Sequence, residues 1–100
     1  MIIKTLKLKY GTYNNVNVII GTYPNNKTTS LMLSSKGEPI AIASVNLPES
    51  KLLPQRCCFI KSYSENEGLL EELIKNKIVS TIGLTAHTGY VKCEAVRILD

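Results

Sequence analysis

The sequence predicts an α+β fold: a curved antiparallel sheet of about six strands, with a four-strand meander first, and one helix over about residues 65–76 packed on one face. Three observations support this prediction. Apolar and polar residues alternate through most of the first half, short turn signals separate the alternating stretches, and one later stretch has helical periodicity. One hundred residues, 44% of them hydrophobic, suit a single domain over residues 1–100 that buries a core without metals or disulfides.

The first two strands are predicted from alternation. Residues 2–13 predict a half-buried strand, because successive side chains of a strand point to opposite faces. Its two faces carry Leu6, Leu8 and Tyr10 on one side and Thr5, Lys7 and Lys9 on the other. Asn14 and Asn15 favour a hairpin turn, since asparagine tolerates positive φ. Residues 16–23 then predict the second strand.

Two more strands complete the predicted meander. Residues 24–26, Pro-Asn-Asn, predict a turn, and residues 28–35 predict the third strand. Residues 36–39 predict the next turn, in which Gly37 is free to take a positive φ. Residues 40–47 predict the fourth strand, so four strands joined by short turns should pair in sequence order.

The remaining strands lie on either side of the predicted helix. Residues 48–54 are expected to form a loop, because a proline at each end lacks the donor that a sheet needs. Residues 56–62 predict a short fifth strand. Residues 80–90 contain two glycines and are expected to form a loop, and residues 91–99 predict the last strand.

The helix is predicted from a start signal and an apolar stripe. Ser64 and Glu67 have the spacing of a capping box, so we expect a helix of about 11 residues from Glu65. The side chains expected to pack on the sheet are Leu69, Leu70, Leu73 and Ile74. Gly68 is unusual inside a helix, where it costs about 0.8–1 kcal/mol relative to alanine. We expect it to let the helix lie close to the sheet.

Half of the eight acidic residues lie within residues 64–72. The simplest interpretation is a solvated helix face, in which the first acids offset the helix dipole and Glu71 pairs with Lys75 four residues on. The alternative is a contact surface for a partner protein. Its candidate residues are Tyr63, Glu65, Glu67, Glu71 and Glu72.

The net charge of +4 is unevenly distributed. Residues 1–61 carry eight Lys or Arg against two Glu, whereas residues 62–100 carry four against six acids. A basic surface suits nucleic acid, and the candidate residues for such a role are Lys4, Lys7, Lys9, Arg56 and Lys61. Two arginines and no recognisable binding motif argue against this role, and lysines on a first strand also protect an exposed edge from aggregation.

Catalytic and metal chemistry have little support in the sequence. Cys57, Cys58, Cys93 and His87 are potential zinc ligands, but adjacent cysteines in a strand point to opposite faces. We therefore expect three buried, reduced cysteines, a solvated imidazole in a loop, no metal and no cofactor. No nucleophile-elbow or phosphate-loop motif is present, so we expect no catalytic residues and no enzyme activity. A cysteine- or metal-dependent enzyme remains as a third hypothesis.

The sequence also bears on location. No apolar run approaches the roughly 20 residues that span a membrane, so no membrane partner is expected. Lysines interrupt every apolar stretch of the first ten residues, which is not typical of a signal peptide. We therefore expect a cytoplasmic protein, either a monomer or a homodimer formed through an uncovered sheet edge.

Residues 45–48, Val-Asn-Leu-Pro, and residues 63–68, Tyr-Ser-Glu-Asn-Glu-Gly, resemble a family of small domains of unknown function. These domains are carried on conjugative and phage-like elements of gut and related bacteria, and the resemblance is strongest over residues 44–79. It implies an accessory protein of a mobile element in a bacterial host cell, with no catalytic residue to transfer. Such proteins often block host machinery, so the resemblance implies an anti-CRISPR-like inhibitor of a Cas nuclease or another defence protein. A charge of +4 differs from the acidic DNA mimics among such inhibitors.

Overall fold

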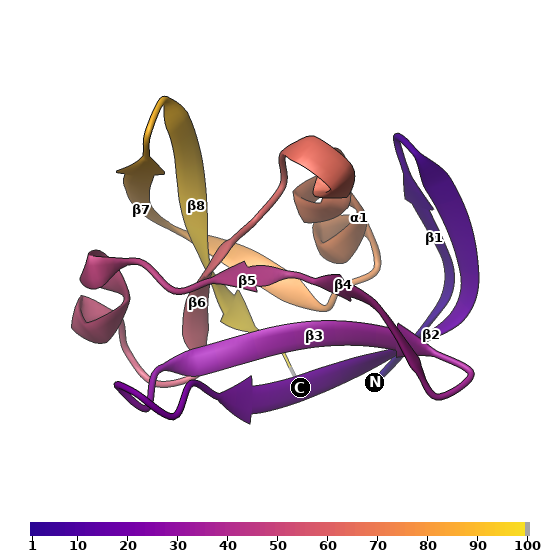
Figure 1. The fold of residues 1–100 in the computed structure, drawn as a ribbon, viewed down its shortest axis with the longest axis horizontal. Coiled ribbons are helices and arrows are strands. Elements are labelled where there is room, and N and C mark those ends of the chain that lie inside the picture. Colours follow the sequence, from indigo (N-terminus) through magenta and orange to yellow (C-terminus); the bar gives the residue numbers. More distant parts are fainter. Residues whose placement is uncertain (100) are drawn as a thin grey trace.

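The structure is a computed structural model and describes residues 1–99, which form two four-stranded antiparallel sheets and one α-helix (Figure 1). The first sheet has the strand order β1-β2-β3-β4, and the second has the order β5-β6-β8-β7. The first sheet contains β1 (Ile2–Leu8), β2 (Gly11–Thr22), β3 (Thr29–Ser35) and β4 (Glu38–Ile42). The second contains β5 (Ser44–Val45), β6 (Cys57–Ile60), β7 (Val79–Thr88) and β8 (Val91–Ile98).

The helical segments are short. They are the 3₁₀ helices η1 (Pro48–Leu52) and η2 (Ser64–Asn66) and the α-helix α1 (Leu69–Lys75). The α+β class with antiparallel strands and one α-helix is confirmed for residues 1–99, whereas the single sheet of about six strands is wrong in detail. None of the helices in this range has the length and apolar character needed to cross a membrane.

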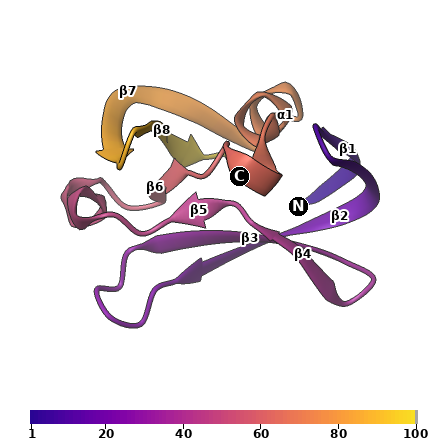
Figure 2. The same ribbon diagram turned by 45° about the horizontal axis from the view of Figure 1, so that its top comes forward.

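The predicted fourth strand, residues 40–47, is divided between the two sheets at Ala43. The Ala43 N–H donates to the Leu31 carbonyl oxygen in the first sheet (2.9 Å), and its own carbonyl accepts from the Lys61 N–H beside the second (2.7 Å). The buried Ser44 hydroxyl oxygen also accepts from the Leu31 N–H (2.9 Å). One extended segment therefore pairs first with β3 and then with β6, which is why two sheets form instead of one (Figure 2).

The first hairpin turns earlier than the sequence predicts. β1 ends at Leu8, which pairs with Gly11, so Lys9 and Tyr10 form the turn and the predicted turn at residues 14–15 is wrong. Asn15 does have a positive φ of 54°, but it lies inside β2. Ile3 and Leu6 are both buried although they are three residues apart, and between them the strand pairing skips Lys4 and Asn15. The turns at residues 24–26 and at Gly37, with φ 79°, are confirmed.

The predicted helix over about residues 65–76 is wrong at its start. Ser64 has a positive φ of 57° and begins η2, while Gly68 has φ 92° and separates η2 from α1. Ser64 and Glu67 therefore form no capping box. Instead, the Ser62 hydroxyl oxygen accepts from the Leu70 N–H in the first turn of α1 (2.9 Å).

Residues 80–90, expected to be a loop, lie mainly in the ten-residue strand β7. Gly83 has φ 80°, and the pairing of β7 with β8 changes register between Thr81 and Thr85. The glycine that suggested a loop thus marks a bulge within a strand. Strand β8 agrees with the predicted last strand.

The second sheet has an apolar core on each face, and both cores meet at β6. The main core fills the space between the two sheets and α1, and its central residues are Ile3, Leu6, Leu31, Leu33, Leu69, Leu73 and Val96. A smaller core on the far face of the second sheet contains Leu47, Phe59, Ala86, Cys93 and Ala95. All four residues of β6 are buried for this reason. Leu69 and Leu73 of the predicted stripe are fully buried, whereas Ile74 is exposed.

Candidate functional site

The acid-rich segment, residues 64–72, connects the two edge strands of the first sheet. At the edge of β1, the Lys7 N–H donates to Glu72 Oε1 (2.8 Å), and in the turn directly after β1 the Lys9 N–H donates to the Glu67 carbonyl oxygen (3.1 Å). At the edge of β4, the buried Asn66 side-chain amide donates to the Ile42 carbonyl oxygen (2.9 Å). Unpaired edge groups invite strand pairing with other chains, and this segment satisfies three of them (Figure 1).

Two of the predicted partner-binding carboxylates form ion pairs with predicted nucleic-acid-binding lysines. Glu67 Oε2 lies 3.1 Å from Lys9 Nζ, and Glu65 Oε1 lies 2.9 Å from Lys61 Nζ. The hydrogen bond from Lys61 lowers the pKa of Glu65, and the hydrogen bond to Glu67 raises the pKa of Lys9. The two candidate surfaces therefore meet, and part of their charge is mutually compensated.

Tyr63 and Glu71 complete the predicted partner-binding set. Tyr63 is partly buried against the smaller core, with Lys61 Nζ 5.7 Å from its ring centroid. The Glu71 side chain is exposed and makes no hydrogen bond or ion pair within residues 1–99, so the predicted pair with Lys75 is not formed. Glu71 is thus the acid of this segment that remains most available to a partner.

The predicted nucleic-acid-binding residues do not form one surface. Lys4, Lys7 and Lys9 lie on or next to β1, and their side chains are exposed. Arg56 lies in the loop between η1 and β6, at the opposite end of the molecule from β1 (Figure 1). There it lines a cavity of about 400 Å³ together with Lys27 and Lys51. These two lysines were not among the predicted residues, because nothing local in the sequence shows that residues 27, 51 and 56 converge.

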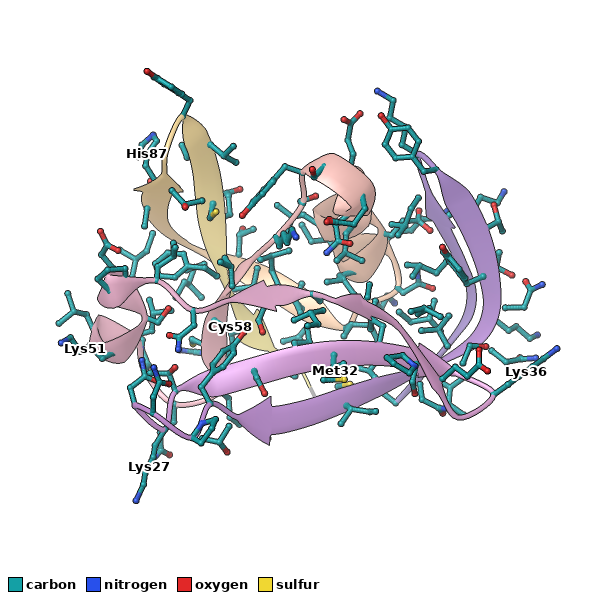
Figure 3. The ribbon with its side chains drawn as sticks, viewed as in Figure 1. Lys27, Met32, Lys36, Lys51, Cys58 and His87 are labelled. Atoms are coloured by element: carbon teal, nitrogen blue, oxygen red, sulfur yellow. The ribbon has the colours of Figure 1, made fainter. Side chains whose placement is uncertain are left out.

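The three cysteines are buried free thiols. Burial, and secondarily the neighbouring Cys57, raises the pKa of Cys58 to about 12, and burial also raises the pKa of Cys93. These two groups are therefore protonated near neutral pH, a poor state for a nucleophile or a metal ligand. His87 lies on β7 opposite Lys92 and is exposed, not in the expected loop (Figure 3). Within residues 1–99, no three His, Cys, Asp or Glu side chains are grouped as a metal site would require.

The outer face of the first sheet carries an unexpected row of apolar side chains. Ile19 pairs with Met32 and Met32 pairs with Ile42, so the three lie side by side across β2, β3 and β4. They are 46%, 38% and 56% exposed, and Figure 3 marks Met32 on β3. Ile2 is 66% exposed and pairs with Asn17, which lies on the same face of β2 as Ile19, two residues earlier. Ile2 therefore lies diagonally beside Ile19. We call Ile2, Ile19, Met32 and Ile42 the apolar row.

A signal for the apolar row was present in the sequence. The triplets Leu31-Met32-Leu33 and Ile40-Ala41-Ile42 are apolar at every position, so an apolar side chain lies on each face of the strand.

No family model matches this chain, and neither a curated protein nor a solved structure is significantly similar to it. The resemblance to domains of mobile elements stays a prediction.

Proposed function

We propose that this chain is a small non-enzymatic binding protein of a bacterial mobile element or phage, and that it inhibits a host defence protein, such as a Cas nuclease, by direct contact. The resemblance over residues 44–79 supports the biological setting. The observation that carries the mode of action is the apolar row on the outer face of the first sheet.

The apolar row suits a protein partner because its side chains are contiguous. Directly paired residues of neighbouring strands hold their Cβ atoms about 4.5–5.5 Å apart, so the row presents one surface. Contiguous exposed apolar patches are uncommon on monomeric proteins and often mark interaction sites. Completing the burial of four half-exposed aliphatic side chains would contribute on the order of 4 kcal/mol. Association costs at least about that much, so the row would form the centre of a larger interface.

The charge of the first sheet indicates the sign of the charge expected on the partner surface. Residues 1–42, which form the first sheet and its turns, contain Lys4, Lys7, Lys9, Lys27 and Lys36 against one acid, Glu38. Lys9 is paired with Glu67, so the four other positive charges less one negative charge leave +3 on this part of the chain. The complementary surface is an apolar centre bordered by carboxylates, since opposite potentials across an interface favour association and set specificity.

The proposal is tested with purified Cas nucleases in pull-down and DNA-cleavage assays. We expect at least one nuclease to bind the chain and to lose activity. Met32→Asp and Ile42→Asp should each weaken inhibition about tenfold or more, because a charge would be buried at the centre of the contact. Leu84→Asp is the matched control: Leu84 is 50% exposed on β7 of the other sheet.

Two results would contradict different parts of the proposal. Full cleavage with no co-elution across the panel would remove the nuclease target. Equal weakening by all three aspartate variants would remove the apolar row as the contact surface. Glu71→Lys tests the acid-rich alternative, since loss of inhibition in that variant alone would assign the contact to the predicted surface around Tyr63 and Glu71.

The alternative function is a nucleic-acid-binding accessory protein that uses the lysine-bearing face of β1. The exposed side chains of Lys4 and Lys7 favour it. Gel shifts over a salt series separate the two functions, because affinity through phosphate contacts falls steeply as salt increases. Lys4→Gln with Lys7→Gln should weaken such binding, while the aspartate variants of the apolar row should leave it unchanged.

A further inference from the structure

The cavity of about 400 Å³ between the β2–β3 turn and the η1–β6 loop is a second surface feature that the proposed function does not use. We propose that it binds a phosphate-bearing anion. None of the four side chains of the apolar row lines this cavity, so the two proposals can fail independently.

The charge of the cavity favours an anion. Two of the twelve cationic residues of the chain, Lys27 and Lys51, line it from separate segments, and Arg56 lies in its wall. None of the described residues that line it is acidic. In Figure 3, Lys27 and Lys51 lie at the same end of the molecule and extend into solvent. Their flexible stems let both ammonium groups turn toward a bound anion.

Neutral polar groups supply the rest of the lining. Thr22, Thr29 and Gln55 offer hydroxyl and amide donors to a phosphate oxygen. Anion sites that discriminate phosphate from bulk chloride need several such donors in addition to charge, because each oxygen of the anion must replace its hydrogen bonds to water.

The walls of the cavity are held in place by hydrogen bonds. In the β2–β3 turn, the Thr28 hydroxyl donates to Asn26 Oδ1 (2.8 Å), and the Asn26 amide donates to Asn46 Oδ1 on the neighbouring segment (3.0 Å). In η1, the Ser50 hydroxyl oxygen accepts from the Leu47 N–H (2.9 Å). A site built before the ligand arrives loses less conformational entropy on binding.

The backbone at two of the cations is also unusual. Lys27 has φ 58° and Arg56 has φ 64°, a left-handed conformation that is uncommon outside glycine and asparagine. Such conformations cost free energy and persist where the surrounding structure or a function maintains them. Both residues line the same cavity.

The lining also limits the class of ligand. No aromatic side chain among the described residues faces the cavity, so it offers no platform on which a nucleobase could stack. Its volume is near the lower end of that of ligand pockets. The recognised chemistry is therefore the phosphate group itself, carried either by a small phosphorylated molecule or by a nucleic-acid backbone.

The experiment is a titration of the ¹⁵N-labelled full chain with pyrophosphate and, separately, with a random single-stranded oligonucleotide. We expect pyrophosphate to shift the amide resonances of Lys27, Thr28 and Arg56 saturably, with a Kd on the order of 1 mM or tighter. Lys27→Gln with Lys51→Gln should raise this Kd about tenfold. The control pair, Lys36→Gln with Lys75→Gln, makes the same charge change at exposed lysines outside the cavity, and Lys36 shares the positive φ of Lys27.

Each outcome decides the proposal. Shifts that do not saturate, or equal weakening by both pairs of variants, would show only a general effect of net charge and overturn it. Saturable binding weakened by the cavity pair alone supports it. The two sources of phosphate are then distinguished by affinity and salt: a nucleic-acid backbone binds more tightly than pyrophosphate, with a steep salt dependence, whereas a small phosphorylated ligand gives the oligonucleotide no advantage.

Discussion

Glu72 should contribute more to stability than its neighbour Glu71, because it alone accepts a hydrogen bond from the edge of β1. Both residues lie in the first turn of α1, so both interact with the same helix dipole and have the same helix propensity. The difference is the bond from the Lys7 N–H to Glu72 Oε1 (2.8 Å). A matched pair of alanine variants therefore isolates the value of that bond.

The magnitude follows from the type of bond and its exposure. Hydrogen bonds to charged acceptors contribute about 1.5–3 kcal/mol. Glu72 is only partly buried, so in its absence water can form a hydrogen bond with the Lys7 N–H. The lower end of this energy range therefore applies. We expect Glu72→Ala to cost about 1–1.5 kcal/mol more than Glu71→Ala, which corresponds to a Tm lower by about 4–10 °C in a chain of this size. Glu72→Gln keeps an acceptor without the charge and should lose about half as much.

Urea denaturation followed by far-UV circular dichroism measures the free energies of unfolding, and the m-value should be the same for all variants. Hydrogen exchange of the Lys7 amide provides the local readout and should accelerate in Glu72→Ala only. Equal destabilisation by the two alanine variants, together with unchanged exchange at Lys7, would refute the idea that these acids protect the sheet edge.

Three further predictions concern other parts of the fold. Ser44→Ala should destabilise the fold by about 1–3 kcal/mol, because the Leu31 N–H (2.9 Å) and the Tyr23 hydroxyl (2.7 Å) both lose their hydrogen-bond partner. Urea denaturation measures this cost, and a value below about 0.5 kcal/mol would contradict the prediction. Gly68→Ala should also destabilise the fold, by about 1–2 kcal/mol, because Gly68 has a φ of 92°. The same change would stabilise the fold if Gly68 lay inside a regular helix. The pKa of Lys9 is raised by Glu67, so this contact stabilises the fold fully below the ordinary lysine pKa of 10.5, and its contribution is lost as pH rises through the raised value. NMR titration of the lysine side chains should therefore show the Lys9 pKa returning toward 10.5 in Glu67→Gln, and an unchanged pKa would rule the contact out.

Local signals predicted the elements whose structure depends on neighbouring residues. The turn at residues 24–26, the positive φ of Gly37, the third strand and the last strand needed no knowledge of distant contacts. The burial of Leu69 and Leu73 followed from helical spacing, although α1 is shorter than predicted. Gly68 was correctly singled out, but for the wrong reason. A Cβ there would meet only the Lys9 nitrogen at 4.0 Å, so the residue is needed for its positive φ and not for close packing.

Elements that depend on distant partners could not be predicted from the sequence. The composition of residues 40–47 predicts an extended segment, but not that the pairing partner changes from β3 to β6 at Ala43. The capping-box spacing of Ser64 and Glu67 was overridden because Asn66 and Glu67 bond to β4 and β1 instead. The bond between Glu72 and Lys7 joins residues 65 positions apart, a separation at which spacing rules carry no information.

The pairing of opposite charges at one end of the molecule determines where its net charge acts. Around β1 and the acid-rich segment, Lys9 and Lys61 are compensated by Glu67 and Glu65. The cavity at the other end is lined by Lys27 and Lys51, which form no ion pair with any described acid. The positive charge of Lys27 and Lys51 is therefore not reduced by ion pairing, and a steering field depends on the sum of nearby charges and not on the count of lysines. If the chain binds nucleic acid, neutralising Lys27 and Lys51 should slow association more than neutralising Lys9, although Lys9 belongs to the sequence-predicted set.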